Sequence, residues 1–231
     1  MNRVSVRGFT LTEMIVGIAV LFLFLAIAYL ALEPVIQYLG AAQAKTDTQG
    51  NAVAVLYKLE RDIHESDARA VFYDSSGAQP LPTPSATPVD VTVFAVATAD
   101  TGTNGGSCYP PGAFALTSNG SPNWQGFKVF IRNGQQLNCV FENESMSACN
   151  PLDIPCQSAA TLAITSAKAV ATTSQPFYAT GIVDIKIGAA GGQNGALSGI
   201  IQYVNLQIQA LSTVDGRTNV TSYTDQLQTR N

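Results

Sequence analysis

The apolar and polar positions divide the chain into an uncharged apolar run, a helical segment and a series of alternating segments. The 19 residues from Met14 to Leu32 include no charged side chain. As an α-helix this run would span about 28 Å, at roughly 1.5 Å per residue, which is close to the hydrocarbon thickness of a bilayer. The pattern therefore predicts one membrane-spanning helix over residues 14–32.

The helical pattern continues beyond this run, because apolar residues recur at spacings of three and four. They are Val35, Ile36, Leu39, Val53, Leu56, Leu59 and Ile63. We predict one long helix over residues 9–73, with a kink at Pro34, where the ring removes a backbone hydrogen bond. The i,i+4 pairs Arg61–Glu65 and Glu65–Arg69 indicate the solvated face of its C-terminal half.

A proline-rich segment, residues 74–90, separates this helix from the rest of the chain and predicts a loop. Strand-like runs follow within residues 91–231: Val91–Thr98, Phe127–Arg132, Gln136–Phe141, Phe177–Ile187, Ile200–Leu211 and Thr218–Gln228. Several alternate strictly between apolar and polar residues, as a sheet with one covered face requires. Asn133-Gly134 and Asp215-Gly216 predict tight hairpin turns.

These elements predict an α+β fold. The apolar face of the helix's C-terminal half would cover an antiparallel sheet. At 231 residues the chain has room for one anchor helix and one globular domain.

The charges around the apolar run predict the orientation of the anchor. Arg3 and Arg7 precede the run, whereas the first charges after it are Glu33, Lys45 and Asp47. Since basic flanks stay on the cytoplasmic side, this arrangement favours N-in, C-out. The β-rich domain would then be exported.

Glu13, directly before the apolar run, is not explained by a simple membrane anchor. A carboxylate costs about 2.5–3.5 kcal/mol at the centre of a bilayer and less near an interface, so it favours a cationic partner. An interfacial glutamate in contact with lipid headgroups is the alternative. We interpret Glu13 as a candidate assembly residue.

The segment Arg7-Gly8-Phe9-Thr10-Leu11-Thr12-Glu13-Met14 resembles the signal of type IV pilins and type II secretion pseudopilins. The resemblance implies that a prepilin peptidase removes the leader, residues 1–8, by cutting between Gly8 and Phe9. Phe9 would then be N-methylated, and Glu13 would pair with the N-terminal ammonium of a neighbouring subunit. The implied partners are other pilin or pseudopilin subunits, the prepilin peptidase, an inner-membrane assembly platform, and membrane lipid before assembly.

A second segment, Leu56 to Ile63 followed by Arg69, resembles a helix of J-type minor pseudopilins and W-type minor pilins. This likeness implies a minor subunit that initiates or caps a type IV pilus or a secretion pseudopilus. Glu13 would place the chain beneath another subunit, because the tip-most subunit typically lacks this acid. A major pilin and a pilin-stemmed surface adhesin are the alternatives, and the residues do not choose between pilus, pseudopilus and competence filament.

Ala26-Ile27-Ala28 has the small-x-small form of a signal-peptidase site and is an alternative targeting signal. Cleavage there would release a soluble secreted domain. Glu13, the full length of the apolar run and the absence of a turn signal before Glu33-Pro34 all argue against it.

The net charge argues against nucleic acid as a partner. The chain has 12 basic and 16 acidic side chains, a formal net charge of −4. Loss of Arg3 and Arg7 with the leader would make the chain more acidic. An acidic chain without a basic patch is poorly suited to binding phosphate backbones.

All four cysteines lie in the predicted exported domain, as is typical of an oxidising compartment. Three disulfide pairings are possible. We favour Cys149–Cys156, which would close a small loop around two prolines, with Cys108–Cys139 joining a long loop to a strand. We expect no metal site, because no CxxC pair occurs and the single histidine, His64, lies far from the cysteines.

Neither an enzyme nor a cofactor is expected. Nucleophilic catalysis would require His64, which lies on a helical face among acidic residues and is interpreted as solvated. The glycine-rich stretches, including Asp100 and Asn104, match neither a phosphate-binding nor a calcium-binding template. They are predicted to be surface loops.

Overall fold

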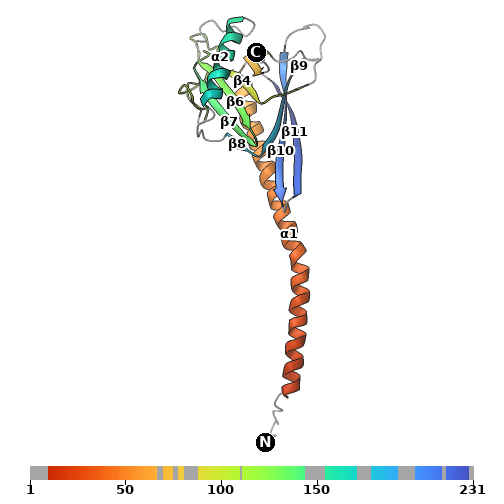
Figure 1. Cartoon of the computed structure of the whole chain (residues 1–231). Helices are drawn as coiled ribbons and strands as arrows, with labels where there is room; N and C mark the ends of the chain where they lie inside the picture. Colours follow the sequence, from red (N-terminus) through yellow and green to blue (C-terminus); the bar gives the residue numbers. More distant parts are fainter. Residues whose placement is uncertain are drawn as a thin grey trace. The chain divides into compact units, whose positions relative to one another are not determined.

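The computed structural model describes residues 10–66, 70–74, 78–80, 88–109, 111–143, 154–170, 178–191, 201–214 and 217–228. The first element is helix α1 (Leu11–His64), and Figure 1 shows how the other elements follow it. The chain divides into two compact units, Met1–Thr46 and Asp47–Asn231. Each unit is described separately below.

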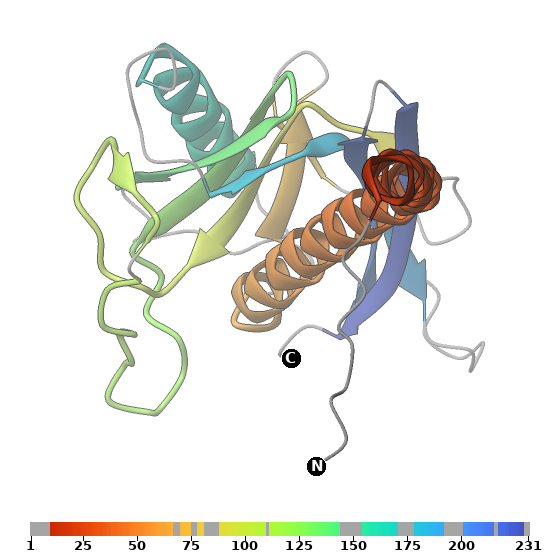
Figure 2. The same cartoon turned by 90° about the horizontal axis from the view of Figure 1, so that it is seen from below.

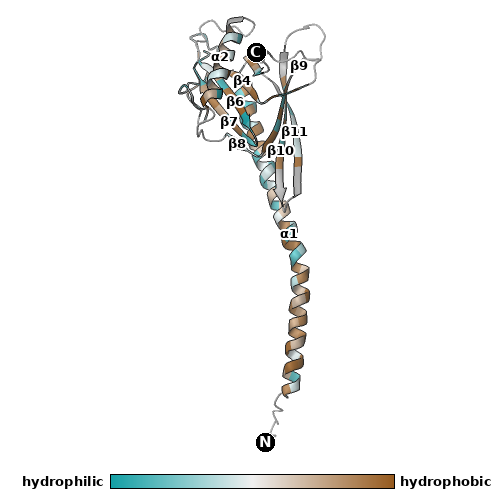
Figure 3. Cartoon of the chain, in the orientation of Figure 1, coloured by the Kyte–Doolittle hydropathy of each residue, from teal (hydrophilic) through white to brown (hydrophobic). Residues whose placement is uncertain are grey.

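The first unit consists, in its described part, of the N-terminal portion of α1. Its large apolar side chains are exposed, for example Phe24 at 73% and Leu30 at 68%. Figure 3 shows the apolar character of this portion of the helix. Among the described helices, α1 is the one that is long and apolar enough to cross a membrane. The helix continues through Pro34, and the kink expected there stays a prediction.

The second unit contains the C-terminal part of α1, a second helix and two antiparallel sheets. The expected helix end at residue 73 is wrong, because α1 ends at His64 and Val71–Asp74 forms strand β1. The segment 74–90, expected to be a loop, contains two short strands, β2 (Ala78–Pro80) and β3 (Val89–Asp90). Backbone pairing with β1 and β9 explains both, since each strand completes a ladder at a sheet edge.

The first sheet is seven-stranded in its described part, with the order β2-β1-β4-β6-β7-β5 and β8 also paired to β7. Its remaining strands are β4 (Val93–Thr98), β5 (Gly106–Ser107), β6 (Gly126–Asn133), β7 (Gln136–Glu142) and β8 (Ala179–Thr180). Strands β6 and β7 form the predicted hairpin: Asn133 pairs with Gln136, and Gly134 has φ of 60°. Glycine adopts this left-handed conformation without steric cost, so the turn is tight.

The second sheet has the order β11-β10-β9-β3. It comprises β9 (Ile182–Gly191), β10 (Ile201–Val214) and β11 (Arg217–Gln228) together with β3. Strands β10 and β11 pair from Tyr203↔Gln228 to Val214↔Arg217, while the predicted turn residues Asp215 and Gly216 lie outside the described residues. One sheet was expected and two are present, because the strands divide between two separate ladders.

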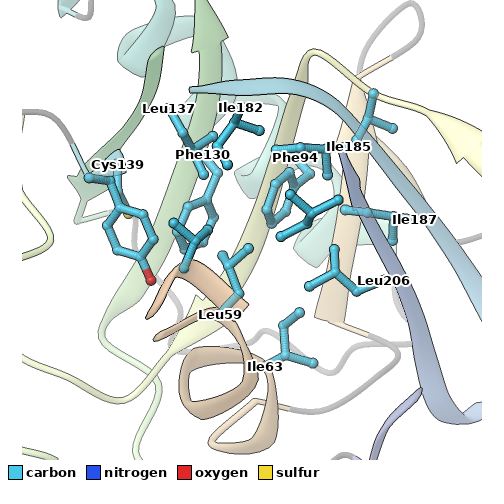
Figure 4. Close-up of a cluster of buried hydrophobic side chains, with 14 of the residues drawn as sticks. Leu59, Ile63, Phe94, Phe130, Leu137, Cys139, Ile182, Ile185, Ile187 and Leu206 are labelled. Atoms are coloured by element: carbon cyan, nitrogen blue, oxygen red, sulfur yellow. The ribbon is translucent and has the colours of Figure 1, made fainter. Parts of the chain in front are cut away.

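The C-terminal part of α1 packs against both sheets in one core. Its contribution is a stripe at helical spacing: Ala52, Val55, Leu59 and Ile63 are all buried. Figure 4 shows Leu59 and Ile63 beside Phe94 and Phe130 of the first sheet and beside Ile185, Ile187 and Leu206 of the second. The predicted α+β fold, with the helix covering antiparallel strands, is confirmed.

A second core lies on the opposite face of the first sheet, where helix α2 (Ile154–Val170) packs. Figure 2 shows α2 and the C-terminal part of α1 on opposite sides of this sheet. The helix buries small residues, among them Ala160, Ala163 and Ala167. It was not predicted, since small residues give a weak apolar pattern.

Candidate functional site

Helix α1 begins with a reciprocal set of hydrogen bonds between Thr10 and Glu13. The backbone N–H of Thr10 donates to Glu13 Oε2 at 2.9 Å, and the Thr10 hydroxyl donates to the same oxygen at 3.0 Å. The backbone N–H of Glu13 donates to Thr10 Oγ1 at 3.3 Å. This is a capping box, in which residues three positions apart satisfy backbone donors that the first helical turn leaves free.

The capping box gives Glu13 a local role that the sequence interpretation did not include. It holds the carboxylate at the first turn of α1, directly before the apolar run, instead of leaving it to extend along the helix. A single carboxylate has more than two acceptor positions, so these bonds leave capacity for a further donor. Glu13 is therefore preoriented at the helix start with acceptor capacity remaining.

Beside Glu13 the helix surface is hollowed at Gly17. The hollow, about 270 Å³, is lined by Glu13, Met14, Gly17, Ile18 and Leu21. A Cβ atom added to Gly17 would meet nothing within 4 Å, so the glycine removes bulk from an open surface. Glycines of this kind allow close approach of a second helix in a membrane.

The other residues of the candidate N-terminal site are Gly8 and Phe9, and both lie outside the described residues. The apolar residues that follow the capping box are exposed from Met14 through Leu25. Such a surface is stable only in lipid or against other apolar surfaces.

Comparison with known families bears on the same N-terminal segment. Residues 3–29 match the family model of the prokaryotic N-terminal methylation motif. Residues 3–29 carry the signature of type IV pilins and pseudopilins. The methylation motif and the exposed apolar helix fit membrane anchoring, processing by a prepilin peptidase and assembly with other pilin subunits. No curated protein and no solved structure matches the chain.

The described cysteines lie in the second unit. Cys108 and Cys139 form a disulfide with a Cα–Cα separation of 5.5 Å, the pairing favoured from the sequence. Cys156 of α2 is buried in the core between this helix and the first sheet and is also disulfide-bonded. Its favoured partner, Cys149, lies outside the described residues.

The residue after the first disulfide, Tyr109, contacts the C-terminal part of α1. The Lys58 ammonium lies 4.8 Å from the centre of the Tyr109 ring, and the Arg61 guanidinium lies 5.4 Å from it. Arg61 also donates a hydrogen bond to the Tyr109 hydroxyl at 3.4 Å. Cation–π contacts of this kind are typically worth about 0.5–1 kcal/mol at exposed sites, so they attach the disulfide-bonded segment to the helix.

A buried ionic cluster, which sequence reasoning missed, joins the same part of α1 to the first sheet. Lys128 of β6 is 1% exposed and Asp62 of α1 is 2% exposed. Lys128 Nζ donates to Asp62 Oδ1 at 2.7 Å and to Asp100 Oδ2 at 2.5 Å. The hydroxyl of Tyr178 donates to Asp62 Oδ2 at 3.2 Å, and Arg61 Nη2 lies 2.7 Å from Asp62 Oδ1.

The cluster perturbs neighbouring titratable groups. Burial, followed by the negative charges of Asp100 and Asp62, raises the pKa of Glu65, and the positive charges of Lys128 and Arg61 oppose this rise. Burial and the charge of Asp62 raise the pKa of Tyr178. Carboxylate oxygens of Asp62, Glu65 and Asp100 lie within 4.8 Å of one another, and the Lys128 ammonium bonds two of these carboxylates.

The helix face around Glu65 agrees only in part with the sequence expectation. The ion pair Arg61–Glu65 is present at 4.0 Å, whereas Arg69 lies outside the described residues. The face was predicted to be solvated, which is wrong for Asp62, because the charge of Lys128 allows that carboxylate to enter the core. His64 is exposed near the end of α1.

Proposed function

We propose that the chain is a minor pilin or pseudopilin that is cleaved between Gly8 and Phe9, methylated at Phe9 and assembled beneath another subunit in a filament. The observation that carries the proposal is the methylation motif over residues 3–29. The matched residues include most of the apolar run 14–32, whose large apolar side chains are exposed in the described helix.

The two parts of α1 support different steps of this function. The N-terminal part, with its exposed apolar surface, would lie in the inner membrane before assembly and against neighbouring helices afterwards. The C-terminal part holds the exported domain through its buried stripe and through Asp62. The chain would span the membrane N-in, C-out, and an inner-membrane assembly platform with a separate ATPase would drive its extraction.

Glu13 is the proposed assembly residue. Its acceptor capacity beyond the capping box would take the methylated ammonium of a neighbouring subunit, and the hollow at Gly17 would admit the approaching segment. Burial of both charges between apolar helices strengthens such a pair, because the effective dielectric constant is lower than in water.

Replacing Glu13 tests this role. Glu13→Gln keeps the size of the side chain and the capacity to accept from Thr10 but removes the charge. We expect normal cleavage and a loss of the chain from sheared filaments of at least tenfold, which corresponds to about 1.4 kcal/mol of lost pairing. Glu33→Gln, on the other side of the apolar run, is the matched control and should assemble normally. Equal incorporation of the Glu13→Gln chain would contradict the assignment.

The subunit class is tested by abundance. A minor subunit is expected at a small fraction of the protein in sheared filaments, and its deletion should reduce the number of filaments instead of removing their main component. Recovery of this chain as the dominant filament protein would favour the major-pilin alternative. The adhesin alternative predicts that substitutions in the largely exposed loop 111–123 abolish attachment while filaments persist. Deleting the whole segment 108–156 would not test it, because that segment contains the core strands β6 and β7.

A further inference from the structure

The buried lysine of the ionic cluster lies in a setting suited to covalent chemistry. Lys128 Nζ is hydrogen-bonded to two carboxylates from different parts of the chain, Asp62 of α1 and Asp100 after β4. The side chains of Lys128, Asp62 and Asp100 are 2%, 0% and 6% exposed, respectively. Burying charged groups away from water costs free energy. In a buried ion pair, transfer of a proton from the ammonium to a carboxylate removes both charges and therefore lowers this cost.

The two carboxylates differ in their surroundings. Asp62 accepts hydrogen bonds from Lys128, Arg61 and Tyr178. Within the described part of the chain, Lys128 is the side-chain donor to the Asp100 carboxylate. Three side chains therefore hold Asp62 in place, whereas one holds Asp100, which makes Asp100 the candidate for attack by the lysine nitrogen.

We propose that Lys128 Nζ and Asp100 Cγ form an intramolecular isopeptide bond. In the hydrogen-bonded pair Nζ lies next to the oxygen that is bonded to this carbon. After the lysine proton has passed to Asp100, the neutral amine attacks Cγ, and a new N–C bond forms.

The remaining proton transfers balance the reaction. The Asp62 carboxylate, 2.7 Å from Nζ, accepts the proton that the nitrogen loses on attack and returns it to the departing hydroxyl. The C–O bond of Asp100 breaks and one water leaves. One carboxylic acid and one amine become one secondary amide and one water, with no oxidant and no other reactant.

The surroundings fit both the product and the released water. A small cavity of about 10 Å³ is lined by Asp100 and Lys128 among other residues, about the size that holds one water. The product amide retains one N–H, which keeps a donor for Asp62. The amide would join β6 to the segment after β4, next to the place where α1 packs on the sheet.

Mass spectrometry of the full-length chain, purified from membranes in detergent and reduced at its disulfides, tests the bond directly. The wild-type chain is expected to be lighter than its processed sequence by the mass of one water. Digestion should yield a branched peptide that joins the segments containing Asp100 and Lys128. In the same digest, the exposed pair Lys168 and Asp74, also in contact, is the internal control and should give linear peptides.

Two variants test the assigned roles. Asp100→Asn should form the same amide with loss of ammonia in place of water. Asp62→Asn keeps the shape of the cluster but removes the proton acceptor, and its chain is expected to stay unlinked. A branched peptide through Asp62 instead of Asp100 would overturn the assignment.

The decisive result comes from the wild-type chain, so a variant that fails to fold leaves the test intact. A protease-resistant wild-type chain with the Cys108–Cys139 disulfide, the full processed mass and Lys128 in a linear peptide would overturn the proposal. The cluster would then be a buried ion pair. This outcome is independent of the proposed filament function, which depends on the N-terminal segment.

Discussion

The two parts of helix α1 use the same kinds of apolar residues in opposite ways. Leu25, before residue 46, is 56% exposed, whereas Leu59 is fully buried. In the first part apolar residues surround the helix, as a membrane or a filament interior requires; in the second they form a stripe that faces a protein core. The distribution of apolar residues around a helix, and not their number alone, thus indicates the solvent for which it is built.

Charged residues show the same contrast. In the first part Glu13 lies at the helix start, held by Thr10. In the second part Asp62 lies within the core and is neutralised by Lys128. Both carboxylates accept hydrogen bonds, but the donor to Glu13 is the neutral Thr10, whereas Asp62 has a cationic donor in Lys128 of β6.

Blocking cleavage is the change with the largest expected effect on the N-terminal part. Gly8→Val places a branched side chain at the proposed scissile bond, and we expect the leader to remain on the chain and incorporation into filaments to be lost. The β-rich domain should fold as before. Peptide mass spectrometry of membranes measures the leader, and Ser5→Val is the control that should be processed. Normal removal of residues 1–8 from the Gly8→Val chain would contradict the proposed site.

A matched pair of leucine substitutions measures the contrast between the two parts directly. Leu59→Ala removes a buried side chain and should lower the free energy of unfolding of the domain by about 2–5 kcal/mol. Leu25→Ala should leave that free energy unchanged, because this side chain has no described contact in the domain core. Denaturant unfolding in detergent, followed by the fluorescence of Trp124, gives both values. Equal effects would show that the first part also contributes to the domain core.

Removing the disulfide Cys108–Cys139 is expected to affect only the second unit, residues 47–231. The pair Cys108→Ser and Cys139→Ser opens a loop of sequence separation 31 and should cost about 2–4 kcal/mol of domain stability. Cleavage at Gly8 should continue unchanged. Thermal unfolding of the oxidised wild type and of the double variant gives the difference. A double variant as stable as the oxidised chain would show that the disulfide adds nothing.

The smallest expected effect concerns Asp184 of β9. Burial, and then a hydrogen bond and repulsion from Asp90, raise the pKa of Asp184 above its usual 3.8. The folded chain therefore binds this proton more tightly than the unfolded chain, and stability falls as the pH rises from about 3.8 through the folded-state pKa. Asp184→Asn should stabilise the domain at neutral pH and lose this advantage below pH 3.8. Unfolding midpoints of both chains at two pH values measure the stability difference. A stabilisation by Asp184→Asn that grows in acid would contradict the prediction.

The elements with strong periodicity could be predicted from the sequence. Strict alternation in Val183–Ile187 and in β10 identified strands, and Asn133-Gly134 identified the β6–β7 turn. The buried stripe of α1 followed from apolar residues at helical spacing. In each case the local pattern and the tertiary environment favour the same structure.

Other features depend on contacts that no local pattern contains. Helix α2 presents alanines such as Ala160 and Ala163, which carry little apolar surface to mark a face. A lysine within a strand such as β6 is ordinarily predicted to face solvent. The burial of Lys128 depends on Asp62 and Asp100, which are distant in sequence. The division of the strands into two sheets likewise depends on pairing between distant segments.

The most direct test of the proposed function is the N-terminus of the mature chain. Intact-mass and peptide mass spectrometry of the protein from its native membranes determines it. An N-methylated Phe9 as the first residue is the predicted result. A chain that begins at Val6 or earlier would contradict it and leave a simple anchored domain, and a chain that begins at Tyr29 would contradict it and indicate a secreted one.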